Sequence, residues 1–329
     1  MGLFLKNEKL RQAQFKASSH YFSDAARLDG MYRGVARPFC LPGEYAEENL
    51  IPEIRESALA HFAQHSIKWH NGQYGKPSNH LCSSQVACVN FLFPFSDKPD
   101  LLAQLLSRVY PEINRMIPVE NKLYVSFEWI GRENYLGEKI SRNGLRHRGA
   151  LFTSADAIVA FERKDKQCQV VLIEWKYGES YGGSFLRYAK SGTDRTGIYR
   201  HLLESPDCPI NTDILLNFEC LFYEPFYQFM RQQLLANEMQ KANELNGDLV
   251  SVLHISPDHN NDFRKVTSPQ LKGLGESATG IWKILMKNKE RFNSVSTETL
   301  FGDLSSIKSA EISSWKEYIE TRYAWIRTD

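Results

Sequence analysis

Three charged residues in the middle of the chain have the types and the spacing to hold a cation. Glu174 and Lys176 lie at the end of the apolar run 169–177 with only Trp175 between them. On a β-strand, both of their side chains would therefore point to the same side. Asp156 opens the preceding apolar run, and pairing of the two runs would bring it alongside them. Charges among buried apolar residues are costly unless they are compensated, which argues against a chance arrangement.

Two carboxylates and a lysine that converge at a strand end suit a hard divalent cation. Mg²⁺ takes one or two carboxylates, several waters and the phosphate oxygens of a substrate. A metal held in this way polarises a phosphoryl oxygen and supplies a hydroxide nucleophile near neutral pH. We therefore predict Mg²⁺, with Mn²⁺ as the alternative, bound by Asp156 and Glu174, with Lys176 orienting the water or offsetting charge on phosphorus. The competing interpretation is a buried Glu174–Lys176 ion pair that only stabilises the sheet; the presence of Asp156 favours the metal site.

The order Asp156, then Glu174-Trp175-Lys176, on two predicted strands resembles the signature of the PD-(D/E)XK nuclease superfamily. The proline that usually precedes the aspartate is Ala155 here, at a position that varies in the superfamily and supplies no ligand. The resemblance implies a restriction-endonuclease-like fold, which is an α/β protein with an αβββαβ core. Its mixed central sheet is flanked by helices, and we expect extra N-terminal and C-terminal helices. The resemblance also implies metal-dependent hydrolysis of phosphodiester bonds.

The elements that must position these residues follow from hydrophobic periodicity and turn residues. The runs 156–162 and 169–177, joined by a polar turn, predict a β-hairpin, with further strands at 122–130 and 249–255. Helical spacing predicts helices at 6–17, 44–64, 101–116, 214–243 with a break near Pro225, 281–292 and 314–325. We divide the chain into an N-terminal helical layer (1–79), a nuclease-like core (80–260) and C-terminal helices of the same domain (261–329).

Two further polar residues are candidates for the site. In the superfamily, the first core helix often lends a polar group; here that helix begins at the caps Ser83 and Ser84, so the candidate is Gln85. A solvated Gln85 is an equal alternative. The Ser-Ser-Gln block, together with the tryptophan between the glutamate and the lysine, resembles an uncharacterised prokaryotic branch of the superfamily. Glu128, in the strand before the hairpin, is a further metal ligand, a group that supports one, or a partner of Arg132.

Two segments beside the hairpin combine positive charge with aromatic rings. The first, residues 131–149, has Glu133 and Glu138 as its only acidic residues, against Arg132, Lys139, Arg142, Arg146, His147 and Arg148. In the second, residues 181–200, tyrosines alternate with arginines, which suits phosphate contact with base stacking. The nucleic-acid-binding candidates are Arg146, Arg148, Tyr181, Arg187 and Arg195. The competing interpretation is a solvated surface, because charge runs are usually solvated.

Composition sets the wider limits. A formal net charge of +1 over 329 residues gives no global basic signature, so any nucleic-acid groove must be a local patch. Six scattered cysteines without a CxxC pair predict free thiols in a reducing compartment. His80, Cys82 and Cys88 are better explained as core cysteines beside a loop histidine than as a zinc site. The N-terminus shows no long apolar segment of a signal peptide, and no apolar run is long enough for a membrane span, so we expect a soluble, cytoplasmic protein.

The sequence therefore predicts a metal-dependent nuclease that acts on nucleic acid, with DNA favoured over RNA. The alternative of another class is a nucleic-acid-binding protein that keeps the scaffold without turnover, which the intact Asp, Glu and Lys disfavour. An acyl hydrolase lacks its Gly-x-Ser-x-Gly motif. The glycine pattern at 273–278 follows a loop and not a strand, which disfavours a dinucleotide site. A homodimer or an obligate partner protein is compatible with the sequence.

Overall fold

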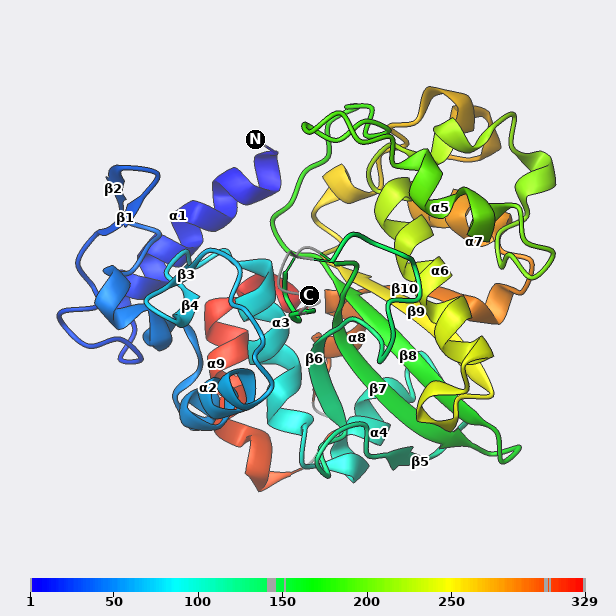
Figure 1. The fold of residues 1–329 in the computed structure, drawn as a ribbon. Helices are drawn as coiled ribbons and strands as arrows, with labels where there is room; N and C mark the ends of the chain where they lie inside the picture. Colours follow the sequence, from blue (N-terminus) through cyan, green and yellow to red (C-terminus); the bar gives the residue numbers. More distant parts are fainter. Residues whose placement is uncertain (1, 141–145, 151, 305–306, 308, 328–329) are drawn as a thin grey trace.

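A mixed six-stranded β-sheet forms the centre of the protein (Figure 1). The structure is a computed structural model that describes residues 2–140, 146–150, 152–304, 307 and 309–327. The strands of the sheet are β5 (Ile113–Ile117), β6 (Val125–Trp129), β7 (Ala155–Arg163), β8 (Cys168–Trp175), β9 (Leu249–Ser256) and β10 (Phe292–Ser296). They lie in the order β10-β9-β8-β7-β5, and β6 also pairs with β7.

The αβββαβ core expected from the sequence is confirmed. Helix α3 (Ser84–Leu92) precedes β6, β7 and β8, and α6 (Phe226–Lys241) then leads to β9. Strand β7 pairs antiparallel with both β6 and β8, joined to β8 by the predicted polar turn. Strand β9 runs parallel to β8, because the crossover through α6 returns the chain to the same edge before it re-enters the sheet.

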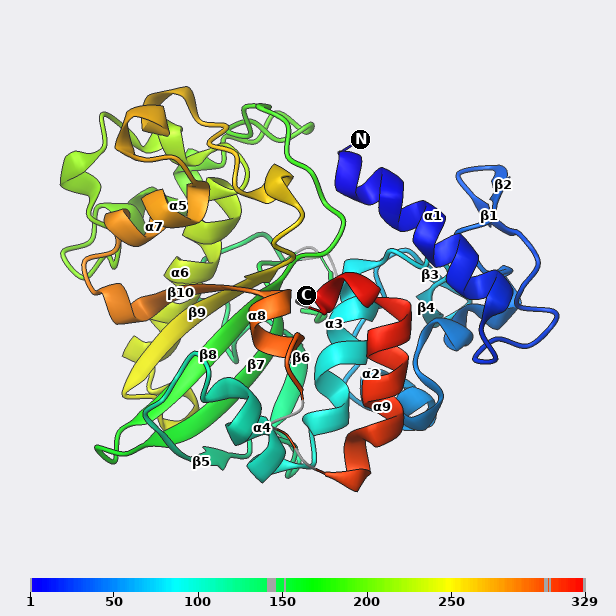
Figure 2. The same cartoon turned by 180° about the vertical axis from the view of Figure 1, so that it is seen from behind.

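Side chains of the central strands alternate between two apolar layers. Val159 and Phe161 of β7 face the layer of α3 and α9 (Ser313–Arg322), whereas Ile158 faces α6 and α7 (Ala278–Leu285). Helices therefore cover both faces of the sheet, as the two opposite views show (Figures 1 and 2). A strand with apolar neighbours on both faces has few places for a charge. For this reason, the charges at the ends of β7 and β8 indicate a specific role.

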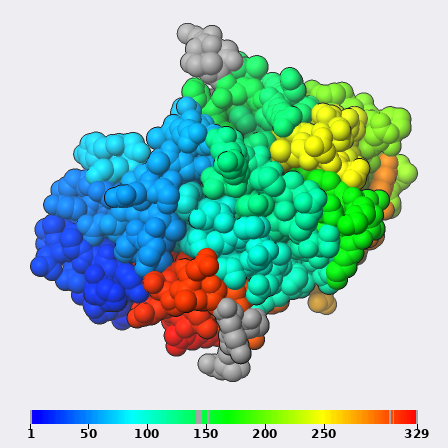
Figure 3. Space-filling model, turned by 90° about the horizontal axis from the view of Figure 1, so that it is seen from below, coloured from blue at the N-terminus to red at the C-terminus, as the bar shows by residue number. Residues whose placement is uncertain are grey.

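The N-terminal layer packs against the C-terminal helix. Figure 3 shows the blue N-terminal surface adjoining the orange and red C-terminal surface. The guanidinium of Arg322 in α9, which is 2% exposed, donates to Gln12 at 3.0 Å and to Asn49 at 2.6 Å, and so ties the two ends of the chain together. The layer contains α1 (Leu3–Ser18), α2 (Arg55–Gln64) and two small hairpins, β1 (Gly30–Tyr32) with β2 (Val35–Arg37) and β3 (Gly72–Gln73) with β4 (Lys76–Ser78).

Two of the predicted helices are wrong in their second halves. In the segment 101–116, α4 spans Pro99–Leu106, and Pro111, which lacks an N–H for a helix, separates it from edge strand β5. In the segment 281–292, α7 ends at Leu285, and the chain then enters β10 beside β9. The apolar spacing of both segments fits a helix locally, but pairing with distant strands decides the outcome.

Two other predicted helices begin late because of prolines. The helix expected at 44–64 is preceded by two 3₁₀ turns around Pro52, and α2 starts only at residue 55. The helix expected at 214–243 starts after Pro225, which marks the predicted break, and short 3₁₀ turns occupy the segment before it. Two short helices complete the fold, α5 (Thr196–Leu203) and α8 (Thr297–Phe301).

The cysteine prediction is confirmed, because all six are free thiols. Among the described residues, no helix is both long enough and apolar enough to cross a membrane.

Candidate active site

A pocket of about 300 Å³ lies where β7 begins and β8 ends, and we call it the carboxylate pocket. It joins the predicted residues to groups from the loop after α2, the N-terminus of α3 and the first turns of α6. Its lining residues are His70, Ser84, Gln85, Ala150, Phe152, Ser154, Asp156, Glu174, Trp175, Lys176, Glu179, Gln228, Arg231 and Gln232.

The acids of the pocket belong to a row of polar residues across the sheet. Glu174 of β8 is in register with His254 of β9. The pairs that flank them place Asp156 of β7 opposite Glu174, and Glu128 of β6 opposite Asp156. Neighbouring side chains on one face of a sheet have Cβ atoms about 4.5–5.5 Å apart. The sheet thus brings three carboxyl groups together from residues far apart in the sequence.

Asp156, Glu174 and Lys176 meet as predicted. Asp156 Oδ2 accepts the backbone N–H of Trp175 at 2.7 Å, which fixes its carboxylate beside β8. Lys176 forms an ion pair with Glu174, whose side chain is 2% exposed. Gln232 donates to the other oxygen of Glu174 at 2.8 Å. Glu174 Oε1 is buried and is the oxygen that pairs with Lys176 Nζ.

Burial strongly perturbs the acids of this pocket. It raises the pKa of Glu174 to about 8, an effect that Asp156 increases and Lys176 opposes. It also raises the pKa of Asp156 to about 7, where Lys176 opposes burial and Glu128 adds to it. Burial alone lowers the pKa of Lys176, but Glu174, Tyr181 and Asp156 hold that pKa well above its usual value. Without a further cation, the pocket therefore retains protons that free carboxyl groups would lose near pH 4.

Glu128 lies behind the pocket wall and orients the residues in front of it. Gln85 donates to one of its oxygens and Ser154 to the other, each at 2.8 Å, and His70 Nε2 lies 3.7 Å away. No ion pair joins Glu128 to Arg132 in the described part of the chain, so the supporting role fits the geometry better. Its backbone has φ = 51°, a left-handed conformation that costs a non-glycine residue about 1–3 kcal/mol and that often marks functional sites.

Gln85 reaches the pocket because its helix is capped as predicted. Ser83 accepts the N–H of Val86 and starts α3, which puts Gln85 in the first turn. The Gln85 side chain accepts the backbone N–H of His70 at 2.8 Å as well as donating to Glu128. It is 5% exposed, so the solvated alternative is excluded. Gln85 links the N-terminal layer to the row of acids.

Sequence reasoning missed the polar face of α6. Gln228, Arg231 and Gln232 occur at helical spacing and line the carboxylate pocket. Arg231 donates to Thr153 Oγ1 at 3.2 Å and stacks over the ring of Tyr227, but within the described chain it joins no ion pair. Its Nε is enclosed and has no partner. The one available signal was an arginine inside an apolar helix of the core.

The predicted nucleic-acid-binding residues are mostly engaged with the protein. Arg148 is bonded to Glu120, and Arg146 donates to the backbone carbonyl oxygens of residues 130–132. Arg187 pairs with Asp194 at 2.8 Å, and Arg195 donates to a backbone carbonyl. Tyr181 lies nearest to the acids and donates to Gln228 at 3.2 Å. Arg142 lies outside the described residues.

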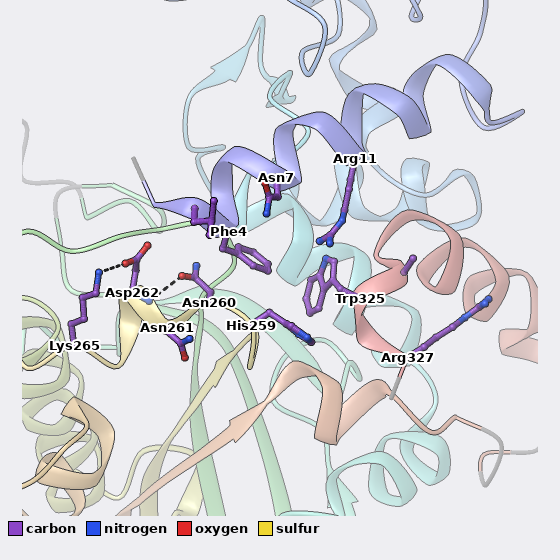
Figure 4. A pocket seen from close by; sticks show the side chains of 12 residues that line it. Phe4, Asn7, Arg11, His259, Asn260, Asn261, Asp262, Lys265, Trp325 and Arg327 are labelled. Carbon is purple, nitrogen blue, oxygen red and sulfur yellow. Dashed lines mark hydrogen bonds and ion pairs between the residues drawn. The ribbon is translucent and has the colours of Figure 1, made fainter. Parts of the chain in front are cut away.

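A larger hollow lies apart from the acids. It measures about 650 Å³ and lies between α1, the loop after β9 and the C-terminal turn (Figure 4). Its cations already have partners: Arg11 pairs with Glu8 at 2.6 Å, Arg327 with Glu320 at 3.2 Å, and Lys265 with Asp262. None of them resembles Arg231, which forms no ion pair within the described chain, although, against the lowering effect of burial, Glu224 and Glu138 help to raise its pKa.

Comparison with known proteins yields one match. Residues 9–324 match the model of the family described as Restriction Endonuclease associating with ARP. No curated protein and no solved structure matches the chain.

Proposed function

The chain belongs to the family Restriction Endonuclease associating with ARP, and on this basis we propose that it is a metal-dependent nuclease of the PD-(D/E)XK type. The observation that carries the proposal is the convergence of Asp156, Glu174 and Lys176 in the carboxylate pocket. The substrate would be nucleic acid, with DNA more probable than RNA given the restriction-endonuclease relationship.

The donor set fits a hard divalent cation. Asp156 and Glu174 would hold it, and a bound cation would oppose the burial that raises the pKa of both carboxyl groups. Oε1 of Glu174 is buried and paired with Lys176, so the ion would share this oxygen with the lysine ammonium. Mg²⁺ or Mn²⁺ would supply Lewis-acid activation of the phosphate and of a water molecule.

The protein's own groups would do the remaining work. Lys176 is placed to orient the attacking water and to balance the charge that develops on phosphorus. Arg231 lines the same pocket, its Nε has no partner, and its guanidinium would bind a nonbridging phosphate oxygen, which would also compensate its buried charge. Gln85 and Glu128 would hold the wall of the pocket in place.

A path for the substrate strand continues from the pocket. A second hollow of about 300 Å³ shares His70, Ser84, Gln85 and Glu179 with the carboxylate pocket. It extends to Lys9 and Tyr32 of the N-terminal layer, where a cation and an aromatic ring suit a phosphate and a base. The family description names association with ARP, which favours a partner protein over a chain that works alone.

The test is cleavage of single-stranded and duplex DNA and RNA with Mg²⁺, Mn²⁺ or EDTA. Wild type is compared with Glu174→Gln and Lys176→Ala. We expect metal-dependent cutting that each substitution lowers by at least about a hundredfold. The matched controls are Glu162→Gln and Lys166→Ala, which remove an ion pair of 3.1 Å at the far end of the same hairpin and should retain activity.

The opposite result would identify a binding protein. If wild type binds nucleic acid but never cuts it in any metal, and Glu174→Gln and Lys176→Ala differ from it only in melting temperature, the acids are structural. The test is made with and without the ARP partner, because a partner-dependent nuclease would cut only in the complex.

A further inference from the structure

A second group of metal-ligating side chains lies outside the carboxylate pocket. His61 and His65 are four residues apart at the end of α2, and Glu120 lies in the turn before β6. One ligand atom from each lies within 4.8 Å of the other two. We call these three residues the histidine site. In the described part of the chain this is the one group of at least three histidine, cysteine or acidic side chains with such close ligand atoms.

The helix presents both imidazoles to the same side. Residues at positions i and i+4 are neighbours on one helix face, and the rings of His61 and His65 have centroids 4.7 Å apart. His65 Nδ1 lies 3.2 Å from Glu120 Oε1. Two ligands of a tetrahedral ion at about 2.0–2.1 Å are about 3.3 Å apart, so this pair already has ligand spacing.

The third ligand is directed toward the same point. His61 Nε2 lies 3.5 Å from Ser126 Oγ, and that hydroxyl donates to Glu120 Oε2 at 2.5 Å. For tetrahedral spacing of about 3.3 Å, the widest separation of the ligand atoms, at most 4.8 Å, must shrink by up to about 1.5 Å. A rotation of the His61 ring toward Glu120 would achieve this.

Surrounding residues hold the ligands in position. The amide of Asn121 contacts His65 Nε2 at 3.2 Å; with its oxygen on that side it would accept the Nε2 proton and leave Nδ1 free to bind a metal. Arg148 donates to both oxygens of Glu120, at 3.0 and 2.9 Å. Each carboxylate oxygen has two lone pairs, so one remains for a metal.

The site is also accessible. His61, His65 and Asn121 line a hollow of about 400 Å³ that lies apart from the carboxylate pocket and shares no residue with it. Water from this hollow would complete the coordination of an ion that has three protein ligands.

We propose that His61, His65 and Glu120 bind one transition-metal ion of the Zn²⁺, Co²⁺ or Ni²⁺ class, separate from the proposed catalytic metal. Two imidazoles and one carboxylate select these ions over Mg²⁺, which prefers oxygen ligands. The ion would fasten α2 of the N-terminal layer to the turn before β6, the strand that carries Glu128. Its role is structural support for the wall of the carboxylate pocket.

The test measures metal binding and melting temperature without any cleavage assay. Metal-free protein is titrated with Zn²⁺ and Co²⁺ by calorimetry, visible absorption and metal analysis after gel filtration. Wild type, which also has the carboxylate pocket, should bind at least one equivalent, Glu174→Gln should bind one, and both should melt at a higher temperature with Zn²⁺. His65→Gln and His61→Gln should lower the affinity at least tenfold and lose the Zn²⁺-dependent stabilisation. The matched control is His20→Gln, at an exposed histidine in the same layer.

Two outcomes would overturn the proposal. One is that wild type binds no stoichiometric Zn²⁺. The other is that folded His61→Gln and His65→Gln bind it as tightly as wild type. If both variants fail to fold, NMR of the Co²⁺-loaded wild type decides: paramagnetically shifted imidazole protons from two histidines support the site, and their absence refutes it. Glu174→Gln changes the carboxylate pocket and leaves the histidine site unaltered. Metal binding at the histidine site can therefore be tested even if the nuclease proposal fails.

Discussion

The carboxylate pocket and the histidine site are the two proposed metal sites, and the charges within them are compensated to different extents. In the carboxylate pocket, burial raises the pKa of Asp156 and of Glu174, and Lys176 compensates only part of the negative charge. At Glu120, burial also raises the pKa, but the hydrogen bond from Ser126 and the charge of Arg148 outweigh burial and lower it. Burial lowers the pKa of His61 to about 4, so its imidazole is neutral at pH 7.

The difference shows what each site requires. The charges of the histidine site are balanced without a metal. A bound ion would therefore further stabilise a site that is already folded. In the carboxylate pocket, the pKa values of two carboxyl groups remain raised despite Lys176, and Arg231 forms no ion pair within the described chain. On the proposed function this pocket would take a cation and a phosphate together, so substitutions in it should affect catalysis much more than folding.

The largest expected effect separates the two sites directly. Asp156→Asn keeps an oxygen that can accept the Trp175 N–H but removes a charged metal ligand, so we expect cleavage to fall by about a thousandfold or more. His65→Gln should lower cleavage by less than about threefold, because the histidine site does not touch the carboxylate pocket. Initial rates at saturating Mg²⁺ measure both. Equal losses of cleavage rate in the two variants would contradict the distinction between the two sites.

A smaller loss is expected from Arg231. Arg231→Gln removes the charge proposed to bind phosphate, and we expect kcat to fall by about a hundredfold, with Arg231→Lys recovering part of it because lysine lacks the planar guanidinium. Arg200→Gln is the control, since Arg200 is exposed and pairs with Glu204 at 3.1 Å. An unchanged kcat with a lower melting temperature would mean that Arg231 serves only to pack α6.

Substitution of Glu128 tests whether this residue acts through its neighbours or binds the metal itself. If it orients Gln85 and Ser154, Glu128→Gln should weaken the affinity for the catalytic metal by about 10–100-fold, and excess metal should restore most of kcat. If Glu128 is itself a ligand, excess metal should not restore kcat. The control is Glu244→Gln, another buried carboxylate, which accepts from Trp129 and Tyr135 at 2.8 and 2.7 Å.

What the sequence could predict here was local. Alternation along one strand places Glu174 and Lys176 on the same side, and a serine cap places Gln85 in the first turn of α3, so neither needed knowledge of distant residues. The predicted hairpin placed Asp156 beside Glu174, and this too needed only neighbouring parts of the sequence. The limit appears at 101–116 and 281–292, where apolar spacing indicated helices but long-range pairing made β5 and β10.

Site residues that are brought together only by tertiary contacts could not be predicted from the sequence. Arg231 and Gln232 belong to the polar side of α6, and a sequence does not distinguish a polar face that lines a pocket from one that meets solvent. His61 and His65 have helical spacing, but Glu120 meets them only through a turn in which Asn121 and Lys122 adopt left-handed conformations. Such turns are fixed by their surroundings more than by their own sequence.

The smallest expected effect is the pH dependence of stability in the metal-free protein. With the pKa of Asp156 at about 7 and that of Glu174 at about 8, the folded state holds protons that the unfolded chain has lost above about pH 5. Stability therefore falls as pH rises through these values. We expect the melting temperature of wild type to drop by a few degrees between pH 6.5 and pH 8.5, and Mg²⁺ to reverse the drop. Asp156→Asn should flatten the profile and His65→Gln should leave it unchanged; thermal melts across this range would contradict the charge argument if wild type and Asp156→Asn gave the same slope.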